Sequence, residues 1–202
     1  MAPRTSGRGL VVTGAAGWLG RAIIARANAE STAHGWSSVT ALIRDATEES
    51  IVRATWGLDN QIPLTVVAGD IVDASTAFRL LDAALGTDLD VFHTAGAIHP
   101  SRLSDRFRGT EPYNPYLGYG ESKMLGELAV LEATGLRAVV VRPPWFYGPY
   151  QPARQTTFFS MVKAGRFPIF GSGDQQRSMV YIDNLVDGIL AALGYLSAGG
   201  SS

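Results

Sequence analysis

A tyrosine and a lysine four residues apart, Tyr119 and Lys123, are the pair in this chain best suited to chemistry. On a helix, this spacing puts both side chains on one face. A phenol titrates near a pKa of about 10, so it exchanges protons at neutral pH only where a nearby positive charge stabilises the phenolate. Lys123 can supply that charge. The pair indicates proton transfer with a substrate oxygen, although the same spacing also occurs in surface pairs that only stabilise a helix.

A second chemical feature is the glycine-rich stretch TGAAGWLG at residues 13–20, which follows an apolar run. Gly14 permits a tight turn, Gly17 lets the backbone approach a pyrophosphate, and Gly20 lets the next helix pack closely on its strand. The first turn of that helix offers unbonded N–H groups and partial positive charge to an anion. With a strand before it and an amphipathic helix after it, the stretch predicts a dinucleotide-binding turn.

Apolar strands that alternate with amphipathic helices supply the elements that must position these residues. This pattern predicts an α/β fold, a doubly wound parallel sheet of the Rossmann type, with a small and incomplete C-terminal substrate portion. We expect a dinucleotide-binding domain at residues 1–142 and a partial substrate portion with a flexible tail at 143–202. Strands are expected at 9–13, 38–43, 64–68, 90–93, 138–142, 167–170 and 178–182, and helices at 18–28, 47–54, 73–85, 120–134, 156–164 and 184–196, the last capped by Asp183.

The composition narrows the function classes. The 202 residues are 46% hydrophobic and 17% charged, with a net charge of -1, so no nucleic-acid or membrane-surface partner is expected. The chain has no cysteine and neither an apolar run of about 18 residues nor a signal segment, which predicts a cytoplasmic protein. His34, His93 and His99 lack ligand spacing, so no metal site is expected.

These motifs resemble those of the extended short-chain dehydrogenase/reductases, which include nucleotide-sugar epimerases and dehydratases and the hydroxysteroid dehydrogenases. Residues 13–20 are similar to the family's TGxxGxxG turn, and Tyr119 to Lys123 to its YxxxK pair. The resemblance continues through GDI at 69–71, VFHTAG at 91–96, RPPWFYGP at 142–149 and RSMVYIDN at 177–184, and the final motifs look most like the hydroxysteroid-dehydrogenase-like branch.

The resemblance implies an NAD(P)-dependent oxidoreductase that interconverts a hydroxyl and a carbonyl on a small molecule. Tyr119 would exchange the proton, and Lys123 would lower its pKa and hold the nicotinamide ribose. An epimerase or dehydratase that retains its cofactor and a non-catalytic dinucleotide-binding regulator are the alternatives, and a homodimer is an analogy only. The implied cofactor-binding residues are Gly14, Ala16, Gly17, Trp18, Leu19, Gly20, Arg44, Asp70, Ile71, Thr94, Ala95, Gly96, Tyr119, Lys123, Pro144 and Phe146, with Arg177 and Tyr147 as weaker substrate candidates.

The choice of cofactor depends on the end of the second expected strand, where Arg44 precedes Asp45. An arginine at this position pairs with the 2′-phosphate of NADP, whereas an acidic residue accepts a hydrogen bond from the ribose 2′-hydroxyl of NAD. Because Arg44 comes first, NADP is the expected cofactor. NAD is the alternative if the strand ends one residue later.

The interval before Tyr119 departs from the family pattern. Only 18 residues, Ser101 to Gly118, lie where the family has a long helix, a strand and a catalytic serine or threonine. A crossover between parallel strands alone takes about a dozen residues or more, so a segment is missing near 101–106. Either the polypeptide carries a real deletion or the sequence joins two segments across omitted residues. The second is favoured, because losing a central strand would expose a sheet edge. Neither Ser101 nor Ser104 follows a strand, so the third catalytic group is unassigned.

Overall fold

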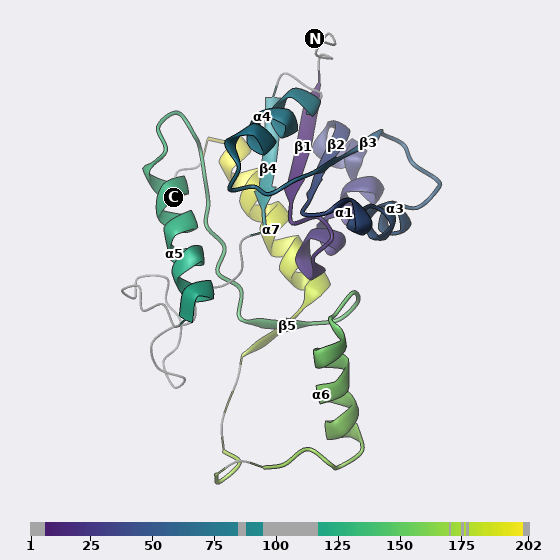
Figure 1. The fold of residues 1–202 in the computed structure, drawn as a ribbon, viewed down its shortest axis with the longest axis vertical. Coiled ribbons are helices and arrows are strands. Elements are labelled where there is room, and N and C mark those ends of the chain that lie inside the picture. The colour runs from purple at the N-terminus through teal and green to yellow at the C-terminus, as the bar shows by residue number, and fades with distance from the viewer. Residues whose placement is uncertain are drawn as a thin grey trace. The chain divides into compact units, whose positions relative to one another are not determined.

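The computed structural model describes residues 7–84, 88–94, 117–169, 171–174, 176 and 178–199 (Figure 1). Its chain divides into two compact units, Met1–Thr94 and Ala95–Ser202.

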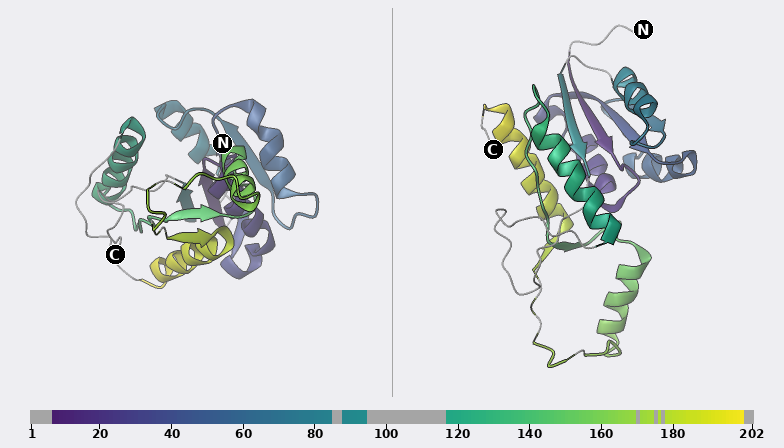
Figure 2. Two further views of the ribbon diagram at one scale, coloured as in Figure 1. Left: turned by 90° about the horizontal axis from the view of Figure 1, so that it is seen from below. Right: turned by 60° about the vertical axis from the view of Figure 1, so that its left-hand side comes forward.

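A four-stranded parallel sheet forms the centre of the first unit (Figures 1 and 2). Because all the strands are parallel, their carboxyl ends meet at one edge. The sheet order is β3-β2-β1-β4, so the chain steps outward from β1 to β3 and then crosses to the other side of β1. That reversal is a topological switch point, where open α/β sheets bind ligands. The strands are β1 (Arg8–Thr13), β2 (Trp36–Ile43), β3 (Leu64–Ala68) and β4 (Asp88–His93).

Apolar side chains on both faces of the sheet build the core of this unit. Leu10, Val11 and Val12 of β1 are each at most 1% exposed, and successive residues of a strand point to opposite faces. On one face, Leu80 packs against Val11 and Leu42. The connecting helices are α1 (Trp18–Ala29), α2 (Ser31–His34), a 3-10 turn η1 (Ala46–Glu48), α3 (Glu49–Trp56) and α4 (Ala74–Ala83). The α/β fold expected from the sequence is confirmed.

The second unit combines three helices with a short parallel strand pair. Its elements are α5 (Leu117–Glu132), β5 (Trp145–Tyr147), α6 (Ala153–Lys163), β6 (Met179–Tyr181) and α7 (Ile182–Ser197), with β5 paired to β6. Aromatic rings hold α6 beside the strands. The ring centroids of Trp145 and Phe158 are 5.5 Å apart, and those of Tyr147 and Tyr181 are 5.6 Å apart.

Three details differ from the sequence-based expectation. Residues 138–142 form no strand, because an apolar run becomes a strand only where a neighbouring strand takes up its hydrogen bonds, and β5 instead begins after the two prolines. Residues 167–169, the described part of another expected strand, are also irregular. Asp183 does not cap α7. The helix follows β6 directly, with Tyr181 at the N-cap position and Asp183 inside the first turn.

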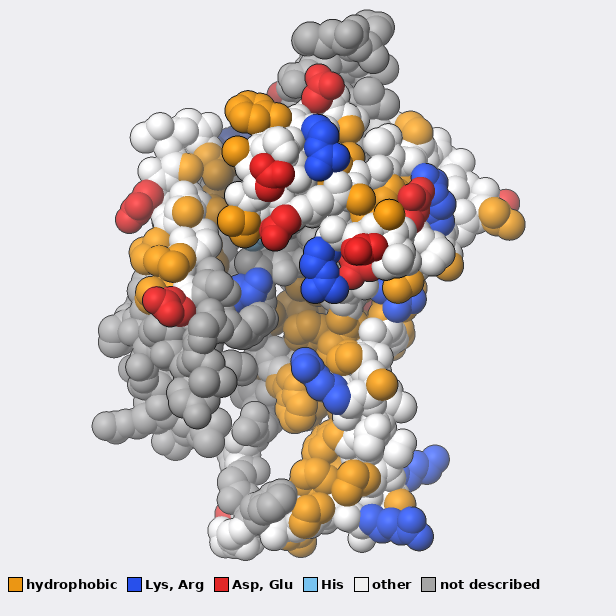
Figure 3. Space-filling view, viewed as in Figure 1, with side chains coloured by type: hydrophobic (Ala, Val, Ile, Leu, Met, Phe, Trp, Pro, Cys, Tyr) orange, Lys and Arg blue, Asp and Glu red, His pale blue; other side chains and the backbone are white. Residues whose placement is uncertain are grey.

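The visible surface of the two units differs in character. In Figure 3, acidic and basic side chains alternate over the first unit, whereas hydrophobic side chains gather beside α6. Met161, Val162 and Phe167 are among the exposed apolar residues there, at 37%, 48% and 38%. Within the described residues, every helix is too short or too polar to cross a membrane.

Candidate cofactor-binding site

The turn after β1 has a backbone that only glycine adopts comfortably at its first position. Gly14 has φ +65°, and a Cβ there would lie 2.6 Å from the Thr94 hydroxyl oxygen. That hydroxyl donates a 2.8 Å hydrogen bond to the carbonyl of Thr13, so it is held in place. A side chain at Gly14 would therefore meet both an unfavourable backbone conformation and a fixed neighbour.

The other two glycines let α1 begin directly against this turn. A Cβ at Gly17 would lie 3.0 Å from the Gly14 carbonyl oxygen. A Cβ at Gly20 would overlap that same carbonyl and lie 2.9 Å from the Cα of Ala15. Gly20 is buried, so a larger residue would push the helix away from the strand.

The start of α1 suits an anion. Gly17 is its N-cap, in an extended conformation, and has no side chain with which to bond the first-turn amides. The first turn also carries no acidic residue. The positive end of the helix dipole therefore meets the switch-point edge of the sheet without a carboxylate beside it, as pyrophosphate binding requires. Ala16, Trp18 and Leu19, the remaining expected residues of this turn, are half-buried around it.

Backbone hydrogen bonds join the three loops at this edge. The N–H of Ala15 donates to the carbonyl of Leu42 at 3.0 Å, and the N–H of Gly69 donates to that of Ile43 at 2.9 Å. Arg44, the next residue of the chain, therefore lies between the glycine turn and the loop that holds Asp70. The Asp70 carboxylate accepts a hydrogen bond from the Val72 N–H at 3.0 Å, and Ile71 beside it is 41% exposed.

The residues that follow β2 form a small charged turn. Glu48 accepts hydrogen bonds from the backbone N–H of Arg44 at 3.1 Å and from its guanidinium at 3.4 Å. Asp45 accepts from the Thr47 N–H at 2.8 Å, and this backbone bond, helped by the Thr47 side chain, holds the pKa of the Asp45 carboxyl below its usual value. Sequence reasoning considered Arg44 and Asp45 but missed Glu48. The spacing of four between Arg44 and Glu48 was the available signal.

His93 is a further residue at this edge that was not assigned a role. Its Nδ1 lies 2.8 Å from the Thr13 hydroxyl oxygen, linking the carboxyl ends of β1 and β4. Together with the bond from Thr94 to Thr13, this contact braces the strand ends from which the glycine turn starts.

In the second unit, α5 carries the expected acid/base pair on its backbone. Tyr119 and Lys123 lie one helical turn apart, and Lys123 is half-buried. The side chain of Tyr119 lies outside the described residues. One turn further, Glu127 is buried, at 7% exposed, and its carboxylate accepts from both Nε and Nη2 of Arg142, the former at 3.0 Å. Sequence reasoning missed this pair because its members belong to different elements.

The segment after Arg142 is held by a second buried polar side chain. Gln155 of α6, 3% exposed, donates to the Phe146 carbonyl at 3.0 Å. Pro144 is exposed and Phe146 half-buried, while Tyr147 is 38% exposed and packs against Tyr181. The ring of Tyr147 therefore belongs partly to the aromatic cluster.

The structure thus brings Gly14, Gly17, Gly20, Arg44, Asp70 and Thr94 to one edge of the first unit. The expected residues Lys123, Pro144, Phe146 and Tyr147 belong to the second unit. Ala95, Gly96 and Arg177 lie outside the described residues. Among the residues that the structure places, no three His, Asp or Glu side chains gather as a metal would require.

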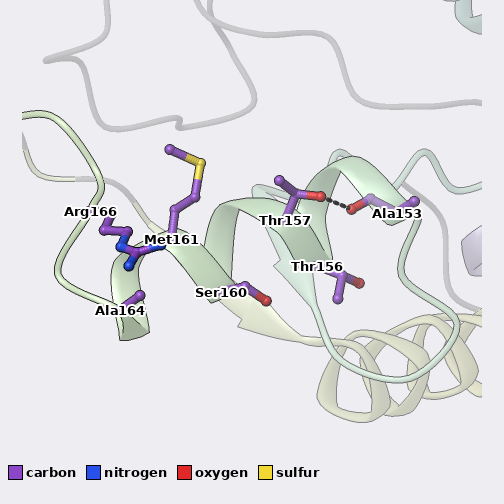
Figure 4. Close-up of a pocket in the computed structure, with 7 residues that line it drawn as sticks. All are labelled: Ala153, Thr156, Thr157, Ser160, Met161, Ala164 and Arg166. Carbon is purple, nitrogen blue, oxygen red and sulfur yellow. Dashed lines mark hydrogen bonds between the residues drawn. The ribbon is translucent and has the colours of Figure 1, made fainter.

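A hollow of about 560 Å³ lies along α6 (Figure 4). It is open to solvent, and none of the expected site residues lines it. It contains no side chain suited to acid/base work at neutral pH. The Thr157 hydroxyl, for example, donates to the Ala153 carbonyl at 3.0 Å. Its lining consists of Ala153, Thr156, Thr157, Ser160, Met161, Ala164 and Arg166.

Comparison with known proteins supplies relatives for both units. The protein y4nL of Sinorhizobium fredii, itself uncharacterised, is 34% identical over 241 positions that cover 95% of this chain and 65% of the relative. This chain thus spans just under two thirds of that relative. Since 95% of 202 residues is about 192, about 49 of the 241 positions have no counterpart in this chain.

Solved structures show the same fold. A mutant UDP-glucuronic acid 4-epimerase from Bacillus cereus, in complex with NAD and a fluorinated UDP-sugar, has a TM-score of 0.63 at 21% identity over 93% of this chain and 73% of that one. The PhqB reductase domain from Penicillium fellutanum has a TM-score of 0.60 at 15% identity over 94% and 65%. The model of the NAD dependent epimerase/dehydratase family matches residues 77–202. The chain belongs to this family, within the extended short-chain dehydrogenase/reductase superfamily.

Proposed function

We propose that this protein is an NAD-dependent enzyme that exchanges hydride with a carbon bearing a hydroxyl or carbonyl group of a small molecule. The observation that carries the proposal is the turn at Gly14, Gly17 and Gly20. Side chains there would collide with backbone or with a fixed hydroxyl, while the start of α1 is left without a capping side chain. This is the space and polarity that a dinucleotide pyrophosphate needs.

When bound, NAD supplies the hydride-accepting ring. The chain's own residues then do the rest. The turn and the N-terminus of α1 bind the pyrophosphate, and the Lys123 ammonium, one turn from Tyr119, stabilises the phenolate of that tyrosine. Tyr119 can then hold or release a proton at its phenol oxygen near neutral pH. Glu127 and Arg142 fix α5 against the segment that leads to Pro144 and Phe146.

For the cofactor, we favour NAD over NADP. The NADP preference expected from Arg44 alone finds no support, since the family is described as NAD dependent and the Bacillus cereus epimerase binds NAD. The local contacts agree, because Glu48 holds the guanidinium on which the expectation rested.

A nucleotide-sugar epimerase or dehydratase that keeps its cofactor is the second candidate. The Bacillus cereus neighbour, a UDP-glucuronic acid 4-epimerase, favours it, whereas the PhqB neighbour is a reductase domain. The two candidates differ in turnover: a reductase consumes added NADH, while an epimerase returns the hydride and needs no added cofactor. Neither neighbour matches the hydroxysteroid-dehydrogenase-like branch.

We also propose that a segment is missing before Tyr119, near residues 101–106. The roughly 49 unmatched positions of y4nL support this, because they would hold the helix, strand and catalytic serine or threonine for which 18 residues are too few. An intact mass of the natural protein tests it. A mass well above 21.5 kDa is expected, and a mass of 21.5 kDa would mean that the deletion is real.

The activity is tested with the tyrosine pair. Tyr119→Phe should bind NAD as the unaltered protein does, measured by calorimetry, but lose about 10²–10⁴-fold in turnover of UDP-sugars or carbonyl substrates. Tyr195→Phe, on the exposed side of α7, is the matched control and should be fully active. Undiminished activity of Tyr119→Phe would refute the catalytic assignment. A protein that binds NAD but acts on no substrate of either class would favour a dinucleotide-binding regulator.

A further inference from the structure

Negative charge predominates beside Arg44. The carboxylates of Asp45 and Glu48 flank its guanidinium in the turn after β2, and Asp70 stands after the neighbouring strand β3. Arg79 is another cation near this edge. The ribose of a bound dinucleotide would meet a region that is not the simple cationic patch suggested by Arg44 in the sequence.

Arg79 is directed to the backbone of β3. Its Nη2 donates to the Ala68 carbonyl at 3.2 Å and to the Thr76 hydroxyl at 3.1 Å. Two partners therefore share the nitrogen that would otherwise be offered to a phosphate. Arg44 remains as the guanidinium on the β2 turn itself.

Glu48 holds Arg44 at two points. One carboxylate oxygen accepts from the Arg44 backbone N–H at 3.1 Å, and the other accepts from Nη2 at 3.4 Å. The Glu48 side chain is 25% exposed, whereas the Arg44 side chain is 82% exposed. The carboxylate is thus the more fixed member, and the guanidinium stays near it at the cost of its reach toward solvent.

We propose that Glu48 sets the cofactor preference of this site, by neutralising Arg44 so that the β2 turn accepts the ribose 2′-hydroxyl of NAD and repels the 2′-phosphate of NADP. The inference rests on the proposed function, since it assumes that a dinucleotide binds at the glycine turn. A 2′-phosphate needs a guanidinium and suffers repulsion from a carboxylate, whereas a 2′-hydroxyl is uncharged and can donate to one.

Glu48 also has a local role that the experiment must separate. Asp45 caps the η1 turn, and a Glu three residues after a capping residue commonly accepts from backbone N–H groups. Gln serves that role as well as Glu, because its carbonyl oxygen accepts the same bond. Glu48→Gln therefore removes the charge and leaves the capping geometry.

The test measures NAD and NADP binding by isothermal titration calorimetry at low salt. Glu48→Gln should tighten NADP binding about tenfold relative to NAD, and added salt should reduce the gain because the groups are exposed. The gain should vanish in Glu48→Gln/Arg44→Ala, which lacks the guanidinium. Glu49→Gln is the matched control: Glu49 makes the same kind of i,i+4 pair with Arg53, at 2.7 Å, and its loss should leave the NADP/NAD ratio unchanged.

The outcomes distinguish this inference from the proposed function. If the unaltered protein binds NAD but Glu48→Gln leaves the ratio within twofold, Glu48 does not set the preference and the cofactor assignment stands. A gain that persists without Arg44 would likewise overturn the inference. If the unaltered protein binds neither dinucleotide, the proposed function fails and this inference fails with it. Melting temperatures of all variants confirm that each is folded.

Discussion

The two units of this chain are held together by different kinds of interaction. In the sheet unit, β1 and β2 are buried almost completely, and the loops at the carboxyl edge are tied by backbone hydrogen bonds such as Ala15 to Leu42. In the α5–α7 unit, specific side chains do this work: the Glu127–Arg142 ion pair, the bond from Gln155 to Phe146, and rings in edge contact.

The difference bears on function. A cofactor turn made of backbone depends on what is absent from a position, so enlarging a glycine should damage it most. A scaffold made of side-chain pairs depends on what is present, so removing one partner should damage it most, and removing both should do less harm. Four substitutions test this contrast.

The largest effect is expected for Gly20→Ala. The added Cβ overlaps the Gly14 carbonyl, so α1 must shift from β1, with a cost of about 3 kcal/mol or more in unfolding free energy and the loss of NAD binding. Denaturant unfolding and calorimetry measure both. Gly188→Ala in α7 is the control, because a Cβ there meets nothing within 4 Å, and it should be neutral or stabilising. Equal effects of the two would end the idea that the turn depends on shape.

A slightly smaller effect is expected for Glu127→Leu, at about 3–5 kcal/mol before relaxation and less if water reaches Arg142. The change leaves a guanidinium that is only 15% exposed without its carboxylate. The double variant Glu127→Leu/Arg142→Met should regain most of the lost stability in a thermal melt. Glu49→Gln, which breaks an exposed pair, should cost under about 0.5 kcal/mol. If the double variant were as unstable as the single one, the pair would be ordinary packing.

Gln155→Leu should cost about 1–3 kcal/mol, because it leaves the half-buried Phe146 carbonyl without this donor. The strand pair β5–β6 should loosen, which amide hydrogen exchange at residues 145–147 would detect. Gln151→Leu is the control, since its bond to Thr156 is exposed. Unchanged exchange in Gln155→Leu would show that the aromatic cluster alone holds β5.

The smallest effect concerns Asp73, the N-cap of α4 in the sheet unit. The Ser75 hydroxyl, and then its backbone N–H, hold the pKa of the Asp73 carboxyl below its usual value. Its contribution to stability is therefore present above the unfolded pKa of about 3.9 and is lost as the pH falls through the lower folded value. Asp73→Asn should keep the cap and flatten this acid limb of the melting-temperature profile, whereas Asp73→Ala should lower the melting temperature at neutral pH as well. An unchanged acid limb in Asp73→Asn would contradict the assignment.

Much of the sheet unit was predictable because its signals are local. Glycines at 14, 17 and 20, an apolar run before them and a helix after them all lie within one stretch of chain, and each has a steric meaning of its own. The α5 helix with Tyr119 and Lys123 was predictable for the same reason. The strand expected at 138–142 was not, because β pairing requires a partner that no local pattern reveals.

The sequence by itself determined the glycine turn, the parallel strand–helix alternation and the spacing of the acid/base pair, since these follow from the conformational preferences of neighbouring residues. Only the tertiary structure decided that Glu48 takes hold of Arg44, that Glu127 meets Arg142 across 15 residues, and that Gln155 supports Phe146. Such contacts depend on which turns and helices meet in space, and a charge in the sequence does not show which neighbour will neutralise it.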